Sequence, residues 1–398
     1  MNSDIYKSIN LNDKEIYCTT DNDKEYPIFI INGEKYLYKP LSKTKPYVCD
    51  ISLFGEVYWS NILNRYFDSS VPISKLAYFD NNKLPKKGEY KFNHGILVKY
   101  FIKDNEKLIN LVDCFNKYPD PNVDISNYMN YALIDYNYVP FFNSSLIKNN
   151  YNLGASLAYQ VLLSLLRCDR NFHYGNVGFI VNEQQLKFHP PIDFEFSSMF
   201  LFCSNSSRKW LNNIIYRNML PINEKYRKAM IEATKMGLNL PLSPENQTNL
   251  FYIIKNYPDV LNTFLNKFKI YQENIDKNIV IDNEEFIQYF FNFSHNFYID
   301  IGTSVHDKNM IELKENISKF NKTINKKDLL ININNDLKKY ALRLEVFIKL
   351  YLLLYKMGYD KLEELTIENV SDILNYDINY NNYESDEYYV KLLKKISK

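Results

Sequence analysis

The chain has 398 residues, of which 46% are hydrophobic, and its 48 basic and 47 acidic side chains leave a formal net charge of +1. This balance excludes a global electrostatic attraction to nucleic acid or to an anionic membrane, so we expect no direct nucleic-acid partner and no membrane partner. The length and the apolar content suit a globular protein whose large core is divided into two or three lobes.

Cysteine usage and the apolar runs indicate the compartment. The five cysteines form no Cys-x-x-Cys pair and no Cys/His cluster with metal-ligand spacing, which is typical of a reducing setting; they are Cys18, Cys49, Cys114, Cys168 and Cys203. The N-terminal segment is polar and lacks the apolar core of a secretory signal. The longest apolar stretches are about half of the ~20 residues that a membrane span needs. We therefore expect a soluble, cytoplasmic protein.

The first predicted elements are two strands at residues 26–40, joined by the Asn-Gly turn at 32–33. An Asn-Gly pair between alternating apolar residues is the strongest short-range signal for a β-hairpin. Alternation in the second strand places Lys39 on the face opposite Tyr36 and Tyr38.

A helix and two more strands follow. Residues 55–67 carry apolar side chains at helical spacing, with Glu56 in the first turn, and the strand-like stretches lie near 73–80 and 94–102. The order strand, strand, helix, strand, strand predicts a small lobe rich in β structure.

The character of the sequence changes after residue 118. Residues 154–168 are apolar on almost every side, which predicts a helix buried in a second lobe. This helix leads into a polar loop at 169–176, a hairpin at 177–189 and a second polar turn at 191–198. Helical patterns dominate the remainder, for example at 339–358, where Gly358 is the expected C-cap.

These elements present, in order, the groups that phosphoryl transfer requires. The reaction needs a cation on the nucleotide phosphates, oxygen ligands for Mg²⁺ and a carboxylate that orients the attacking hydroxyl. Lys39 and Glu56 supply a strand lysine and a helix acid, and the loop with Asp169 and Asn176 is followed by Asp193. Each residue alone is compatible with an ordinary surface charge, a helix N-terminal acid or a turn. Their order along the chain is what favours a nucleotide site.

At this point the sequence resembles a known family. The segments EKYLYKP, FGEVYWSNIL, GILVKYFIKDNEKL, DRNFHYGNVGFI and PPIDFEFSS are similar to those of the HipA-like kinases, which have a phosphatidylinositol-kinase-like catalytic core. The resemblance covers about residues 25–205, and its last two segments are the most specific. It implies an α+β, bilobal, protein-kinase-like fold. The expected parts are a β-rich N-lobe at 1–102, the catalytic part of the C-lobe at 103–205 and a helical C-terminal extension at 206–398.

The resemblance also implies roles for individual residues, with ATP and Mg²⁺ as cofactors. Lys39 would bind phosphate and Glu56 would pair with it. Asn176 and Asp193 would hold Mg²⁺, Asp193 being the first residue of an Asp-Phe-Glu triplet. The residues expected to line the adenine between the lobes are Leu97, Val98, Lys99, Tyr100 and Phe101.

The catalytic loop departs from the family pattern, in which the catalytic Asp stands five residues before the metal-binding Asn, commonly as Asp-Arg-His-x-x-Asn. Here Asp169 precedes Asn176 by seven residues, whereas Asn171 precedes it by five. Either two residues are inserted after Arg170 and Asp169 is the base, or Asn171 has replaced the Asp, and an amide cannot accept the substrate proton. We favour Asp169, because the loop keeps the start and the end of the motif, and we expect His173 to orient the loop.

The leading hypothesis is a cytoplasmic Mg-ATP-dependent kinase that transfers the γ-phosphate to a Ser/Thr hydroxyl of a protein substrate or of itself. The alternative is a catalytically weak or inactive pseudokinase that binds nucleotide and acts as an interaction module, as Asn171 in the usual Asp register would suggest. A lipid kinase is disfavoured because no basic amphipathic helix or polybasic patch occurs. A regulatory partner protein is a further expectation, since HipA-like proteins often act as bacterial toxins with a small DNA-binding antitoxin.

Overall fold

The structure is a computed structural model. It describes residues 9–12, 14–19, 27–40, 50–78, 94–125, 136–169, 172–194, 197, 243–277, 326–358 and 386–396. Asn171, one of the two candidates for the catalytic base, lies outside these residues. Within the described part of the chain, no helix combines the length and the apolar character needed to cross a bilayer.

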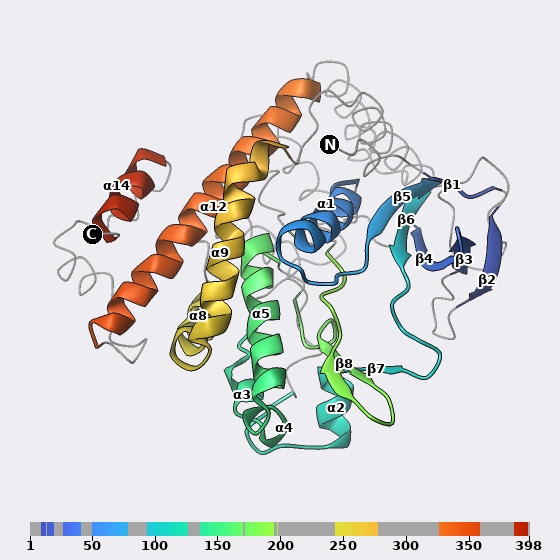
Figure 1. The fold of residues 1–398 in the computed structure, drawn as a ribbon, viewed down its shortest axis with the longest axis horizontal. Coiled ribbons are helices and arrows are strands. Elements are labelled where there is room, and N and C mark those ends of the chain that lie inside the picture. The colour runs from blue at the N-terminus through green and yellow to red at the C-terminus, as the bar shows by residue number, and fades with distance from the viewer. Residues whose placement is uncertain are drawn as a thin grey trace, which may run out of the picture.

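Strands from the first hundred residues form one curled sheet (Figure 1). In spatial order its described strands are β1 (Ile9–Asn10), β5 (Ser74–Tyr78), β6 (His94–Lys99), β4 (Glu34–Pro40), β3 (Pro27–Ile31) and β2 (Glu15–Thr19). β1 pairs with β5 in parallel, and the other neighbours are antiparallel. The predicted strands β3 to β6 are confirmed, whereas β1 and β2 were not predicted.

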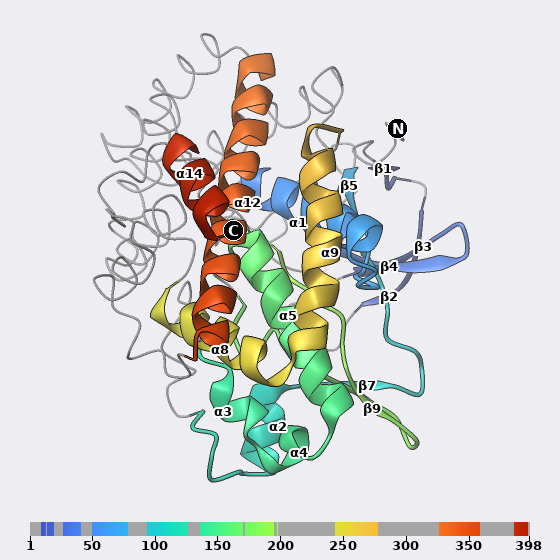
Figure 2. The ribbon, with the colours of Figure 1, turned by 60° about the vertical axis from the view of Figure 1, so that its left-hand side comes forward.

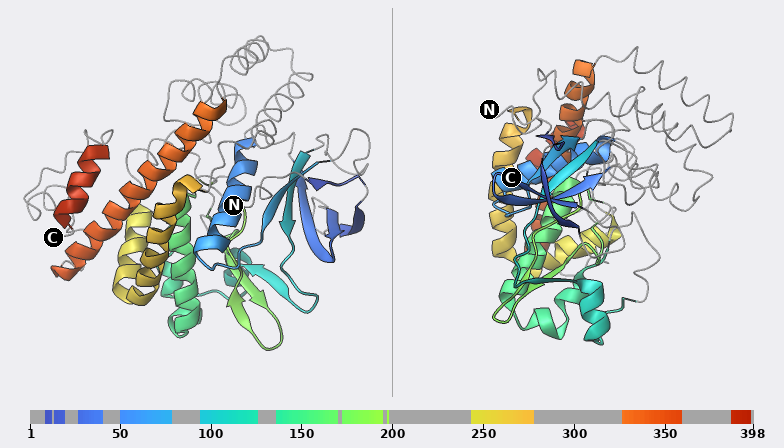
Figure 3. Two further views of the ribbon diagram at one scale, coloured as in Figure 1. Left: turned by 45° about the horizontal axis from the view of Figure 1, so that its top comes forward. Right: turned by 90° about the vertical axis from the view of Figure 1, so that its right-hand side faces the viewer.

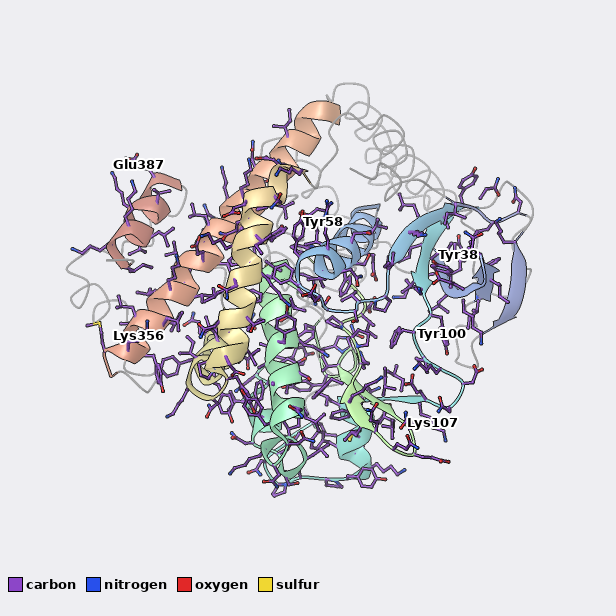
Figure 4. All side chains as sticks on the ribbon, viewed as in Figure 1. Tyr38, Tyr58, Tyr100, Lys107, Lys356 and Glu387 are labelled. Atoms are coloured by element: carbon purple, nitrogen blue, oxygen red, sulfur yellow. The ribbon has the colours of Figure 1, made fainter. Side chains whose placement is uncertain are left out.

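The β3–β4 hairpin sets which side chains of β4 face which way. Asn32 and Gly33 both have positive φ, 53° and 79°, as the two central residues of a type I′ turn require. The turn fixes the register, and Tyr36 and Tyr38 consequently point into the core with 5% and 1% of their surface exposed. Figure 4 shows Tyr38 within the curled sheet.

The two faces of this sheet bury different clusters. The first is a small cluster made of Leu11, Phe29, Tyr36, Tyr38, Ala77 and Leu97. The second face carries Ile96 and packs against helix α1 (Asp50–Tyr66), which joins it to the main core. Lys39 is the cross-strand partner of Ile96, so Lys39 lies on the α1 face. The helix predicted from residue 55 is confirmed, with an earlier start at Asp50.

A second sheet belongs to the lower part of the molecule in Figure 1. It comprises β7 (Lys107–Asn110), β8 (Gly178–Val181) and β9 (Leu186–Phe188) in that order, all antiparallel. β8 and β9 are the predicted hairpin. β7 was not predicted as the partner of this hairpin. The two strands approach so closely that a Cβ at Gly178 would lie 2.3 Å from the carbonyl oxygen of Ile109, so this position needs glycine. Three short helices complete this region: α2 (Leu111–Lys117), α3 (Val139–Phe142) and α4 (Ser145–Lys148).

Helix α5 (Tyr151–Arg167) is the predicted buried helix and leads into the polar loop. Asn150 caps its N-terminus by accepting a hydrogen bond from the backbone N–H of Leu153. At the other end Cys168 has a left-handed φ of 48°, and its N–H bonds the carbonyls of the last turn. The chain therefore turns sharply just before Asp169.

Long helices form the remainder of the described chain: α8 (Pro244–Asn256), α9 (Pro258–Asn274) with the 3₁₀ turn η4 (Ile275–Lys277), α12 (Lys326–Lys356) and α14 (Asp386–Ile396). α9 packs against both α5 and α1, and α14 packs against α12 (Figure 2). Gly358 follows α12 with φ 95°, and its N–H bonds Tyr355 O at 3.0 Å, which confirms the expected cap. Figure 3 shows these helices on one side of the molecule and the curled sheet on the other. The predicted fold class, α+β with a β-rich N-lobe and a mainly helical C-lobe, is confirmed.

Candidate functional site

The centre of the site is Lys39, which contacts carboxylates from two distant parts of the chain. Its Nζ lies 3.5 Å from Oε1 of Glu56 on α1 and 3.2 Å from Oδ1 of Asp193, which follows β9. The Glu56 side chain is 4% exposed, whereas those of Lys39 and Asp193 are 29% and 26% exposed. Lys39 is thus paired with a buried acid, while its own side chain and that of Asp193 are partly exposed.

Asp193 also joins the loop that follows α5. Its Oδ2 accepts a hydrogen bond of 3.2 Å from Nδ2 of Asn176, and Asn176 N–H in turn bonds the carbonyl of His173 at 2.8 Å. Asp193 has φ 61°, a left-handed conformation that is uncommon for a residue other than glycine. Such backbone strain is concentrated at functional sites, and here it accompanies a carboxylate that contacts both Lys39 and Asn176.

Asp169 points away from solvent. Its Oδ2 accepts a hydrogen bond of 2.7 Å from Nη2 of Arg167, and the two side chains are 1% and 0% exposed. A carboxylate covered to this extent does not face an incoming hydroxyl in this conformation. The sequence did not single out Arg167; the signal was a lone charge at the end of an otherwise apolar helix, two residues before Asp169.

Arg167 also contacts the segment after Asp193. Its guanidinium carbon lies 4.5 Å from the centre of the Phe194 ring, within the range of a cation–π contact. Burial lowers the pKa of Arg167, and the nearby carboxylates of Asp169 and Glu56 oppose that shift. One buried cation therefore lies close to three parts of the site.

His173 lies in the same loop and is neutral by its environment. Its Nδ1 accepts a hydrogen bond of 3.0 Å from the backbone N–H of Gly175, so the ring proton is on Nε2. Burial lowers the pKa of His173, and the carboxylates of Asp193 and Asp169 oppose that shift. These contacts suit the expected role of orienting the loop.

The residues expected to line the adenine are distributed over both faces of β6 and the segment after it. Val98 packs against the main core on the α1 face, together with Lys39. Leu97 is fully buried in the small cluster on the opposite face, so the structure does not bring its side chain to the site. Lys99 pairs with Glu34, also away from Lys39. The expectation was drawn from a continuous stretch, but successive strand residues alternate between faces.

Tyr100 and Phe101 lie where the chain leaves the N-lobe. The backbone N–H of Tyr100 bonds Lys35 O at 2.8 Å, and the Phe101 ring lies 6.4 Å from the ring of His189 in the C-lobe. Figure 4 shows Tyr100 on the connecting segment that descends from β6 toward β7. Their position between the two lobes is the one expected for a hinge.

Gly55 explains how the Asp193 segment approaches α1. A Cβ at this position would lie 3.0 Å from the carbonyl oxygen of Phe194 and 3.5 Å from that of Ser197. The absence of a side chain allows these carbonyls to approach the helix one residue before Glu56. The packing of α1 and the placement of Asp193 are therefore linked.

The oxygen donors suit Mg²⁺ bound together with phosphates. Within the described residues, no cluster of three or more His, Cys, Asp or Glu side chains is arranged to hold a metal ion. Mg²⁺ in phosphotransfer sites commonly takes one or two protein ligands and completes its shell with phosphate and water oxygens. The carboxylate of Asp193 and the amide of Asn176, which lie in contact, fit that requirement.

Comparisons with known proteins add little to this geometry. No protein-family model matches the chain, and no curated protein matches it. A solved structure, the crystal structure of a Helicobacter pylori proinflammatory kinase CtkA, is similar over 80% of this chain and 100% of its own, with 13% identity and a TM-score of 0.40. A similarity of this size carries no argument about function. The HipA-like resemblance stays a prediction, and the functional conclusion depends on the side chains described above.

Proposed function

We propose that the protein is a Mg-ATP-dependent kinase that transfers the γ-phosphate to a Ser/Thr hydroxyl of a protein, itself included. The observation that carries this proposal is the position of Lys39 between Glu56 and Asp193, with Asn176 on the far side of Asp193. A cation held by a buried acid, next to an acid–amide pair, is the arrangement that binds phosphates and Mg²⁺ in kinases.

Each residue has a defined task in this proposal. Lys39 binds phosphate oxygens, and Glu56 keeps its ammonium in place. Asp193 and Asn176 would hold Mg²⁺, and the ion would supply positive charge next to the phosphates. For catalysis Asp169 has to become accessible to the substrate hydroxyl while it stays paired with Arg167. It then orients that hydroxyl and takes its proton as the oxygen forms its bond to the γ-phosphorus, while the bond to the β–γ bridging oxygen breaks and ADP leaves.

The test is transfer of radiolabelled phosphate from ATP to the protein itself and to generic protein substrates. Lys39→Met and Asp193→Ala are each expected to reduce transfer at least about a hundredfold, since each removes direct charge stabilisation. Lys75→Met is the control, because Lys75 lies on β5 over the Tyr36 ring, on the opposite face of the same sheet. Equal activity in all three variants would refute the assignment.

A second candidate function is supported by the burial of Asp169. With its carboxylate paired to Arg167 and 1% exposed, Asp169 is withheld from substrate in this conformation. A nucleotide-binding pseudokinase that acts as an interaction module would have this feature. Thermal stabilisation by Mg-ATP without phosphate transfer to any protein, in the wild type and in Asp169→Asn alike, would favour this candidate over the kinase.

A further inference from the structure

Arg167 is a charged group that the proposed mechanism does not use. It is the last residue of α5, it is completely buried, and the other buried residues of that helix are mostly apolar. A buried cation is strongly unfavourable unless carboxylates and hydrogen bonds compensate for its lost hydration. A cation at this point therefore needs compensating partners, and Asp169, Phe194 and Glu56, which interact with it, belong to the site.

These partners come from three separate segments. Asp169, two residues on, supplies the carboxylate at 2.7 Å. Phe194, next to Asp193, supplies the aromatic face at 4.5 Å. Glu56 of α1, the residue that pairs with Lys39, opposes the lowering of the Arg167 pKa through its negative charge.

We propose that Arg167 is a positioning residue of the phosphotransfer site, which fixes Asp169 and the Asp193-Phe194 segment relative to each other. The inference rests on the proposed function and deepens it. Arg167 touches neither substrate nor metal; it acts through Asp169 on the hydroxyl side of the site and through Phe194 on the metal side. A shift of either segment separates the group that orients the hydroxyl from the groups that hold the phosphates.

The chemistry of this position requires arginine in particular. A guanidinium is planar, donates hydrogen bonds in its plane and stacks on an aromatic face at the same time. An ammonium carries the same charge but cannot stack flat on Phe194 while it bonds Asp169. Arg167→Lys therefore preserves the net charge of the buried cluster and removes the geometry that connects the two segments.

The experiment combines steady-state kinetics with hydrogen exchange on the full-length protein. For Arg167→Lys we expect kcat to fall about tenfold to a hundredfold, because a small misplacement of the reacting groups lowers the rate of the chemical step. The KM for ATP should change less than about twofold. We also expect faster amide exchange in the peptides that contain Asp169 and Phe194, and unchanged exchange in α9. Arg343→Lys is the matched control, since Arg343 is also a buried arginine (6% exposed) but lies on α12.

The outcomes separate this inference from the proposed function. If Arg167→Lys merely lowers the unfolding temperature, as Arg343→Lys is expected to do, while kcat per folded molecule is kept, the positioning role is overturned. An increase in kcat would also overturn it, because Arg167 would then be restraining Asp169 rather than placing it. If the wild type transfers no phosphate, the kinase proposal fails, and the exchange measurements alone decide whether Arg167 organises the two segments.

Discussion

Glu56 illustrates how a single buried acid determines the position of a functional cation. Its side chain is 4% exposed. It pairs with Lys39, and its charge also interacts with the guanidinium of Arg167. An unpaired carboxylate in this position would be strongly destabilising, so Glu56 and its cations form a mutually dependent set. These ion pairs fix the position of the Lys39 ammonium but add little to the free energy of unfolding, since buried ion pairs roughly balance their desolvation cost.

Glu56→Gln is expected to keep the fold and weaken nucleotide binding. The amide retains the shape of the side chain but not the charge that holds Lys39, which would then turn toward Asp193 alone. We expect the Kd for ATP to rise about tenfold, in line with the loss of one charge-assisted contact. The measurement is ATP titration by calorimetry, with Glu387→Gln on the exposed face of α14 as the control. Unchanged ATP affinity in Glu56→Gln would contradict the role of Glu56.

A second residue-scale prediction concerns the stability of the protein in mild acid. His189 is 1% exposed, and its Nδ1 donates to Pro190 O at 2.6 Å. Burial lowers the pKa of His189 below the ordinary value of 6.5. The unfolded chain then binds more protons than the folded one below about pH 6.5. The contribution of neutral His189 to stability is complete above that pH and is lost as the pH falls toward the folded-state pKa.

We expect the unfolding temperature to fall between pH 7 and pH 5. The decrease should be smaller in His189→Asn, whose amide can still donate to Pro190 O. The carboxylate of Asp120, whose pKa the backbone N–H groups of Ser145 and Asn122 lower to about 2, stays ionised throughout this window and does not contribute to the slope. Thermal melts at several pH values make the measurement. Identical slopes in both proteins would show that His189 does not titrate in this range.

At the scale of elements, a change in the contact between α1 and the Asp193 segment is expected to affect activity more than stability. Gly55 lies within α1, where alanine is favoured over glycine by about 1 kcal/mol on helix propensity. Its Cβ would nevertheless lie 3.0 Å from Phe194 O, so the segment must move by a few tenths of an ångström. Gly55→Ala is therefore expected to unfold at a temperature near that of the wild type and to lose several-fold in kcat.

Arg65→Ala is the control for this variant, because Arg65 is an exposed residue of the same helix. It is expected to leave kcat unchanged. Enzyme assays and melts on the two variants check the prediction. A fully active Gly55→Ala would mean that the Asp193 segment tolerates displacement, which would weaken the link between α1 and the metal side of the site.

The same elements show what sequence reasoning can supply. The hairpin at 32–33, the helix with Glu56 and the buried helix before Asp169 were predictable, since each has a strong local signal in turn chemistry or periodicity. Alternation shows which residues of one strand share a face, but local signals do not report which strands are neighbours or which face packs against α1. The position of Leu97 follows from the pairing of β6 with β4, and the partners of Arg167 follow from tertiary packing. These features were missed for that reason.

At the scale of the whole molecule, the site is assembled from both lobes. Lys39 and Asp193 are 154 residues apart in the sequence, and their contact joins the curled sheet to the loops of the C-lobe. Among the described residues the lobes also meet at Phe101 and His189 and through α1, which packs on α9. A ligand that binds Lys39 and Asp193 together is therefore held by both lobes at once.

This arrangement predicts that Mg-ATP stabilises the whole molecule. A ligand that binds only the folded protein adds about 2.7 kcal/mol at a concentration one hundred times its Kd. Calorimetric melts should therefore shift upward by several degrees with Mg-ATP in the wild type and in Lys75→Met, and not in Lys39→Met. Since Lys39 belongs to the N-lobe and Asp193 to the C-lobe, Asp193→Ala should abolish the same shift. If the shift survived in either variant, the nucleotide would bind elsewhere, because the residue removed in that variant would not be one of its contacts.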